Sequence, residues 1–134
     1  MANVDINKIL DTADHTAECD GADVEKNKIL SLLSYISLLF LIPMFCAKDS
    51  KFARFHVNQG IVLFICELIV GLVGWVLGLI LGIIPFVGVV LGILLAVVTW
   101  VVELVFLALA ILGIVNAVQG KAKELPVLGG IRVI

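Results

Sequence analysis

Two glutamates, Glu67 and Glu103, are the residues of this chain whose type and position could best support chemistry. They are the only charged residues between Gly60 and Val118, a stretch of 59 residues. A carboxylate inside a bilayer is costly, and intramembrane carboxylates often mark ion or proton paths. Each glutamate lies 18 residues from Pro85. A chain that folds back at Pro85 therefore places both carboxylates at one depth.

Two carboxylates at one depth are expected to titrate as a coupled pair. We predict that at neutral pH at least one of them is protonated, or that the pair holds a cation or the basic side chain of Arg54 or His56. The structural alternative is a carboxylic acid that is hydrogen-bonded to Thr99 or to a backbone carbonyl.

Small residues follow the same mirror pattern around Pro85. Small residues spaced by about four positions let helix backbones approach closely in a membrane. We therefore predict an antiparallel hairpin in which two small-residue stripes face each other. A glycine face that associates with a second copy, giving a homo-oligomer, is the alternative. The predicted packing positions are Gly71, Gly74, Gly78, Gly82, Gly88, Gly92 and Ala96.

The composition predicts an all-α integral membrane protein. The 134 residues are 62% hydrophobic and 15% charged, with a mean hydropathy of +1.21. A soluble core of this length could not bury so much apolar surface, so the lipid bilayer is the expected solvent. A net charge of −2 argues against a nucleic-acid partner. Three scattered cysteines favour neither a disulfide framework nor a zinc site.

Three transmembrane helices are predicted, over about 29–46, 57–84 and 86–118. The first run has 18 residues, roughly 27 Å of helix, which just crosses a hydrocarbon core of about 30 Å. The second and third are expected to form a glycine-lined hairpin that turns at Pro85, because proline ends helices and glycine permits turns. Alternatively, the third splits into a shallow segment over 86–97 and a span over 98–118.

The flanking segments differ in charge. Residues 1–28 form an acidic arm, either a short amphipathic helix or a solvated disordered segment, and 119–134 form a short basic tail. The positive-inside rule places both basic segments in the cytoplasm. We therefore predict a bacterial cytoplasmic membrane protein with its N-terminus outside and its C-terminus inside. Four spans would put the basic segments on opposite faces. Those segments contain Lys48, Lys51, Arg54, Lys121, Lys123 and Arg132.

Polar residues gather where the second and third helices are expected to leave the membrane. They are interpreted as an interface loop with a polar collar that anchors and cross-links the helix ends. In the arm, His15, Cys19, Asp20 and Asp23 suggest a metal, but an EF-hand register on Gly21 lacks its ligands, so no metal is expected. The interface residues are Lys51, Arg54, His56, Asn58, Gln59 and Asn116.

Two sequence segments resemble a known family. These are SKFARFHVNQG and GIVNAVQGKAKELPVLGGIRVI, with IIPFVG between them. Over about 28–134 the chain looks like the Tic-twenty-like family, small bacterial membrane proteins related to a chloroplast inner-envelope import component. The resemblance implies a membrane protein with a translocation-type role, although the plastid relatives are usually pictured with four spans.

The chain shows no nucleophile–base set, phosphate loop or nucleotide fingerprint, so we expect neither an enzyme nor a cofactor. One predicted function is an oligomeric channel or translocation component with Glu67 and Glu103 along a polar path. The alternative is a non-transporting accessory protein that docks a larger membrane-protein partner or anionic lipid.

Overall fold

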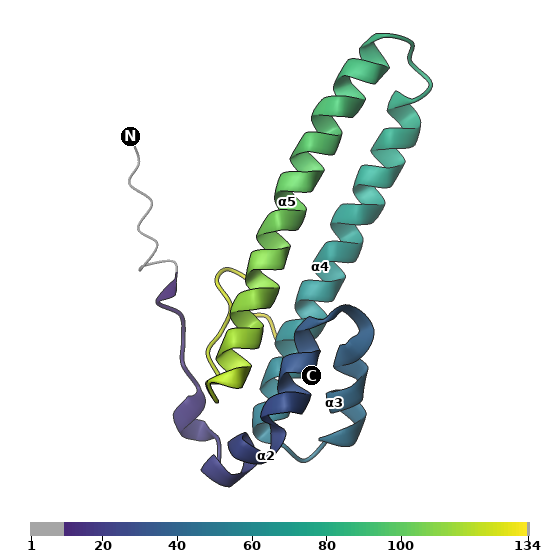
Figure 1. The fold of residues 1–134 in the computed structure, drawn as a ribbon. Coiled ribbons are helices and arrows are strands. Elements are labelled where there is room, and N and C mark those ends of the chain that lie inside the picture. The colour runs from purple at the N-terminus through teal and green to yellow at the C-terminus, as the bar shows by residue number, and fades with distance from the viewer. Residues whose placement is uncertain (1–9, 134) are drawn as a thin grey trace. The chain divides into compact units, whose positions relative to one another are not determined.

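The computed structural model describes residues 10–133, and the fold of this part is helical, with no β-strand. The chain divides into two compact units. One is made of residues up to 64 and from 109 onward, and the other of residues 65–108, so that the two longest helices contribute to both. We call them unit 1 and unit 2. The α-helices are α2 (Gly21–Leu32), α3 (Leu41–Cys46), α4 (Lys51–Leu81) and α5 (Val87–Val118), and the 3-10 turns are η1 (Thr16–Glu18), η2 (Leu33–Tyr35) and η3 (Ser37–Phe40) (Figure 1).

Unit 2 is an antiparallel helical hairpin built from the second part of α4 and the first part of α5 (Figure 1). A turn over 82–86 joins the helices and contains Pro85, as the sequence predicts. Phe86 adopts a positive φ of 59°, which completes the reversal. The third helix is continuous over 87–118, so the proposed split after residue 97 does not occur.

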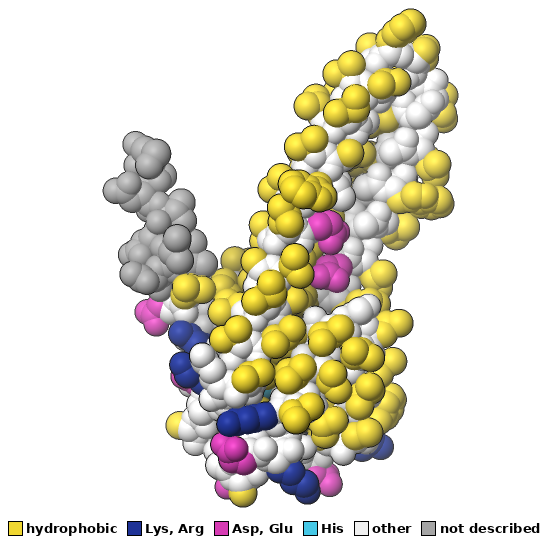
Figure 2. Space-filling view, viewed as in Figure 1, with side chains coloured by type: hydrophobic (Ala, Val, Ile, Leu, Met, Phe, Trp, Pro, Cys, Tyr) yellow, Lys and Arg dark blue, Asp and Glu magenta, His cyan; other side chains and the backbone are white. Residues whose placement is uncertain are grey.

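Both long helices are suited to a bilayer by length and composition. They have 31 and 32 residues, about 47 Å each, which exceeds the hydrocarbon thickness. A helix in the core of a soluble protein would be mostly buried. Here Trp75 and Trp100 are 64% and 65% exposed, and apolar side chains, interrupted by two acidic groups, cover most of the visible face of the hairpin (Figure 2). Lipid is therefore the natural solvent for this surface.

The predicted first span is not confirmed, because no continuous helix covers 29–46. The chain reverses at Ile36 and Ser37, where Ser37 has a positive φ of 47°, and α3 then packs back against α2. Helix α2 has 12 residues and α3 has six, about 18 Å and 9 Å, so neither crosses a 30 Å core. Within the described residues, two helices rather than three are long and apolar enough to cross a membrane.

Two glycines explain why this apolar run folds back within unit 1. A Cβ atom on Gly60 of α4 would lie 1.8 Å from the backbone oxygen of Ser34. One on Gly113 of α5 would lie 2.2 Å from the ring of Tyr35. Only glycine permits these approaches. The η2 turn therefore packs directly onto both long helices, and Ser34 and Tyr35 become buried.

The N-terminal arm pairs with the C-terminal tail inside unit 1. The amide of His15 donates to the Ala122 carbonyl at 2.8 Å, and the amide of Glu124 donates to the Ala13 carbonyl at 2.9 Å. Two segments joined in this way would lie on the same side of any membrane that the long helices cross. The predicted placement of the N-terminus opposite the C-terminus is therefore not confirmed. The predicted amphipathic helix of the arm relied on Val4, Ile9, Leu10 and Ala13, of which Val4 and Ile9 lie outside the described residues.

The start of α4 is capped by two side chains. The Ser50 hydroxyl accepts from the Ala53 amide at 3.0 Å, and the Asp23 carboxylate on α2 accepts from the Phe52 amide at 3.2 Å. These bonds satisfy amides that have no partner within the helix. Burial raises the pKa of Asp23, but hydrogen bonds from Ser50, Phe52 and Asn27 outweigh it and hold the pKa below its ordinary 3.8.

We predict that this cap makes the stability of unit 1 sensitive to acid. A carboxylate with a lowered native pKa contributes stability that is present above its ordinary value and lost as the pH falls through the native value. Asp23→Asn should cost about 1 kcal/mol at pH 7. It should also flatten the fall in melting temperature between pH 5 and pH 3, measured by circular dichroism in detergent. An unchanged pH profile would contradict the role of Asp23.

The close approach at Gly60 gives a second prediction. Gly60→Ala should destabilise the protein by about 1–3 kcal/mol or more, because its neighbour is a backbone atom that cannot rotate away. Gly78→Ala is the matched control, since nothing lies within 4 Å of a Cβ atom there. The control should be neutral or slightly stabilising, because alanine favours helix more than glycine does. Equal melting temperatures for the two variants would refute the packing argument.

Candidate functional site

The two glutamates lie together in unit 2, on opposite helices of the hairpin. Glu67 is on α4 and partly buried, Glu103 is on α5 and exposed, and the two interact electrostatically. Thr99 lies against Gly74 rather than bonding to either carboxylate within the described part of the chain. The two carboxylates therefore lie near each other across the hairpin. The protonation state of the pair, and its proposed role, stay predictions.

The glycine stripes make contact at only some positions. A Cβ atom on Gly74 would lie 3.6 Å from the Thr99 hydroxyl, and one on Gly88 would lie 2.0 Å from the Leu81 carbonyl oxygen beside the turn. Nothing lies within 4 Å of such an atom on Gly71, Gly78 or Gly92. The mirror pattern around Pro85 predicts that Gly74 pairs with Ala96. In the structure, the neighbour of Gly74 is Thr99.

Polar residues at the start of α4 hold the C-terminal tail. The Gln59 side chain accepts from the Leu125 amide at 3.0 Å and donates to the Gly129 carbonyl at 3.0 Å. The neighbouring Asn58 side chain donates to the Ile131 carbonyl at 2.7 Å and accepts from the Val133 amide. Each amide thus satisfies both a donor and an acceptor of a tail without regular structure. We call Asn58 and Gln59 the amide clamp.

His56 completes the attachment of the tail. Its Nε2 atom donates to the Lys121 carbonyl at 2.9 Å, and its Nδ1 atom accepts from the Tyr35 hydroxyl. A carbonyl only accepts, so Nε2 carries a proton, and the full burial of the ring favours the neutral form, in which Nδ1 accepts. The side chain is fully buried, with the Phe52 ring centroid at 4.7 Å. Since both nitrogens are occupied, His56 does not serve as the partner that the sequence proposes for the glutamates.

The interface residues lie on helices rather than in a loop. Residues 51–59 form the first turns of α4, and Asn116 on α5 donates to the Lys123 carbonyl at 3.4 Å. Lys51 and Arg54 are exposed in these first turns. The sequence found the right polar residues. It missed the close approaches at Gly60 and Gly113, and the partner of the amides proved to be the tail backbone.

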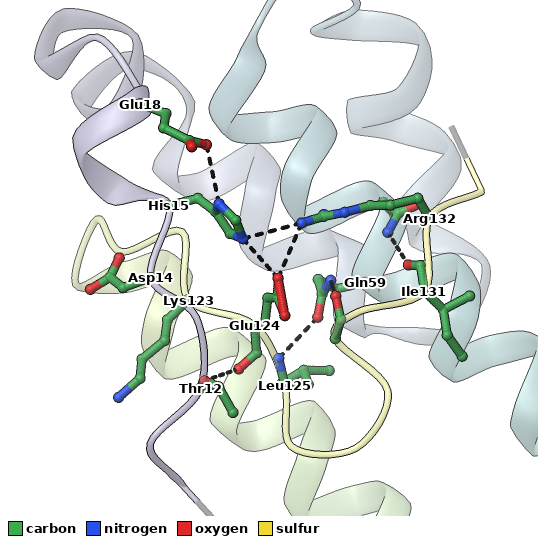
Figure 3. A network of polar contacts seen from close by, with 12 residues as sticks. Thr12, Asp14, His15, Glu18, Gln59, Lys123, Glu124, Leu125, Ile131 and Arg132 are labelled. Carbon is green, nitrogen blue, oxygen red and sulfur yellow. Dashed lines mark hydrogen bonds and ion pairs between the residues drawn. The ribbon is translucent and has the colours of Figure 1, made fainter.

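An ionic network ties the arm to the tail near the amide clamp (Figure 3). The two ring nitrogens of His15 lie 3.1 Å from a Glu18 carboxylate oxygen and 2.7 Å from one of Glu124. Arg132 lies 3.3 Å from that same Glu124 oxygen and stacks over the Phe55 ring. Together with the backbone pairing, this network holds the arm against the tail within unit 1.

The arm residues that could suggest a metal have other partners. Cys19 contacts the His15 carbonyl at 3.7 Å, Asp20 caps α2 through the Ala22 amide at 3.3 Å, and Asp23 caps α4. Among residues 10–133, no group of three or more His, Cys, Asp or Glu side chains is arranged to hold a metal ion.

Comparison with known protein families gives one match. The model of the magnetosome magnetite crystal formation protein family matches residues 26–134, which include all of α3, α4, α5 and the tail, and most of α2. Searches of curated proteins and of solved structures found no match. The resemblance to the Tic-twenty-like family is therefore wrong, because the segments that suggested it belong to the matched family.

The amide clamp gives a direct prediction. Gln59→Ala leaves the buried Leu125 amide and Gly129 carbonyl without partners, at a cost of about 1–3 kcal/mol. Hydrogen exchange at the Leu125 amide should accelerate at least about tenfold. Gln119→Ala, at an exposed position at the end of α5, is the control and should leave this exchange unchanged. Unaltered protection in Gln59→Ala would show that the tail is held by other contacts.

Proposed function

This chain belongs to the magnetosome magnetite crystal formation protein family, and on that basis we propose that it is a non-transporting accessory membrane protein in magnetite crystal formation. The observation that carries the proposal is the extent of the match, which covers both apolar helices and the clamped tail together. The helices would hold the protein in the magnetosome membrane, and unit 1 would present a folded polar surface beside it.

The polar side chains of α4 bind other parts of the chain, and this supports an accessory role over a transport role. Asn58, Gln59 and His56 flank the apolar part of α4, where a transport path would need polar lining. They instead bond to the tail and to Tyr35. A single hairpin encloses no path, so the transport function would require several copies assembled around Glu67 and Glu103.

The orientation follows from the grouping of basic residues. The cations of the loop before α4 and those of the tail all belong to unit 1. By the positive-inside rule, unit 1 would face the cytoplasm, together with the arm that pairs with the tail. A homo-oligomer or a membrane-protein partner, bound through the open glycines of unit 2, would be compatible with this arrangement.

Deleting the protein in magnetite-forming cells tests the proposal. We expect crystals of altered size or shape by electron microscopy, and the native chain should restore them. The doubly substituted Glu67→Gln, Glu103→Gln chain should also restore them if the role is accessory. Normal crystals in the deletion strain would refute the proposal. Failure of the double variant, at normal abundance in the membrane, would favour transport instead.

A further inference from the structure

A cavity of about 560 Å³ opens on unit 1 beside the start of α4. Its walls come from the arm, the loop before α4, the first turns of α4 and the tail. All of these segments belong to the same compact unit. The volume falls within the range of small-molecule binding sites, about 300–1,000 Å³.

The lining of this cavity is cationic although the whole chain carries a net charge of −2. Four of its nine lysines and arginines gather here, against two carboxylates. One of those carboxylates, Glu18, is already bound to His15. Arg132 is paired with Glu124, whereas within residues 10–133 no ion pair joins Lys48, Lys51 or Arg54 to an acid. The charged lining residues are Lys48, Lys51, Arg54, Arg132, Glu18 and Asp49.

Such a lining selects an anion. Guanidinium groups bind phosphate oxygens through paired hydrogen bonds, and ammonium groups add point charges. The amides at the start of α4 are occupied by Ser50 and Asp23, so the side chains must carry the recognition. A metal cation would meet an excess of positive charge.

The surroundings of the cavity favour a lipid as the source of the anion. Helix α3 leads directly into Lys48, whose ammonium group lies 5.8 Å above the exposed ring of Phe45. Leu38, Leu41 and Ile42 on η3 and α3 are also exposed. Cationic groups thus border an apolar surface, and an anionic phospholipid complements both with its phosphate and its acyl chains.

We infer that this cavity is a binding site for a phosphate group, filled in the membrane by the headgroup of an anionic phospholipid. Lys51 and Arg54, which project from the first turns of α4, supply the main contacts, and Lys48 and Arg132 flank them. The inference concerns lipid recognition and does not rest on the proposed role in crystal formation.

Native mass spectrometry of the detergent-solubilised full chain tests the site. The probes are dioctanoyl phosphatidylglycerol, dioctanoyl phosphatidylcholine and inorganic phosphate. We expect phosphatidylglycerol to bind in preference to phosphatidylcholine. The Lys51→Gln, Arg54→Gln variant should bind phosphatidylglycerol at least about tenfold more weakly, since each surface cation contributes about 1 kcal/mol. All four substituted or control positions are exposed, so the fold should survive.

The control variant, Lys26→Gln with Lys121→Gln, removes the same charge away from the cavity and should bind like the native chain. An equal loss of phosphatidylglycerol binding in both variants would show that overall charge, and not this cavity, determines binding. That result would overturn the site. Unchanged binding in Lys51→Gln, Arg54→Gln would overturn it as well. Binding of inorganic phosphate without preference for phosphatidylglycerol would overturn the assignment to a lipid.

Discussion

The structure depends on the need to satisfy the backbone of an irregular tail next to a membrane. Buried amides and carbonyls without partners are costly, and the tail has no helix or sheet to pair them. The amide clamp answers this constraint, because each carboxamide offers both a donor and an acceptor. Leu125 is buried as a result, together with Gln59 itself. The tail thereby becomes part of the fold of unit 1.

Close packing at the η2 turn is the second condition for this arrangement. Gly60 and Gly113 let Ser34 and Tyr35 reach the two long helices, and Tyr35 then binds His56. His56 in turn holds the Lys121 carbonyl. One chain of contacts therefore runs from the folded-back apolar segment through α4 to the tail. Helices α4 and α5 run through both units, but the side-chain hydrogen bonds of the described residues concentrate in unit 1.

Much of the fold could be predicted from composition and from Pro85, because long apolar runs interrupted by proline have few alternatives near a bilayer. The mirror positions of Glu67 and Glu103 likewise follow from a simple reversal. The segment over 29–46 could not be predicted in this way, since 18 apolar residues have the same length whether they cross a membrane or fold back. The signal was present in Gly60 and Gly113. Its meaning required knowing that Ser34 and Tyr35 approach these two glycines, and no local pattern encodes those contacts. The amides were recognised as important, yet backbone partners 66 or more residues away leave no mark in the sequence.

The long separation between the clamp and the tail has a consequence for biogenesis. Asn58 and Gln59 emerge from the ribosome well before residues 125–133 are synthesised. The apolar hairpin of α4 and α5 can therefore enter the membrane while unit 1 is still incomplete. The segment that closes unit 1 becomes available only after both apolar helices have been made. Closure of unit 1 by residues 125–133 is therefore a late step that follows synthesis of the hairpin.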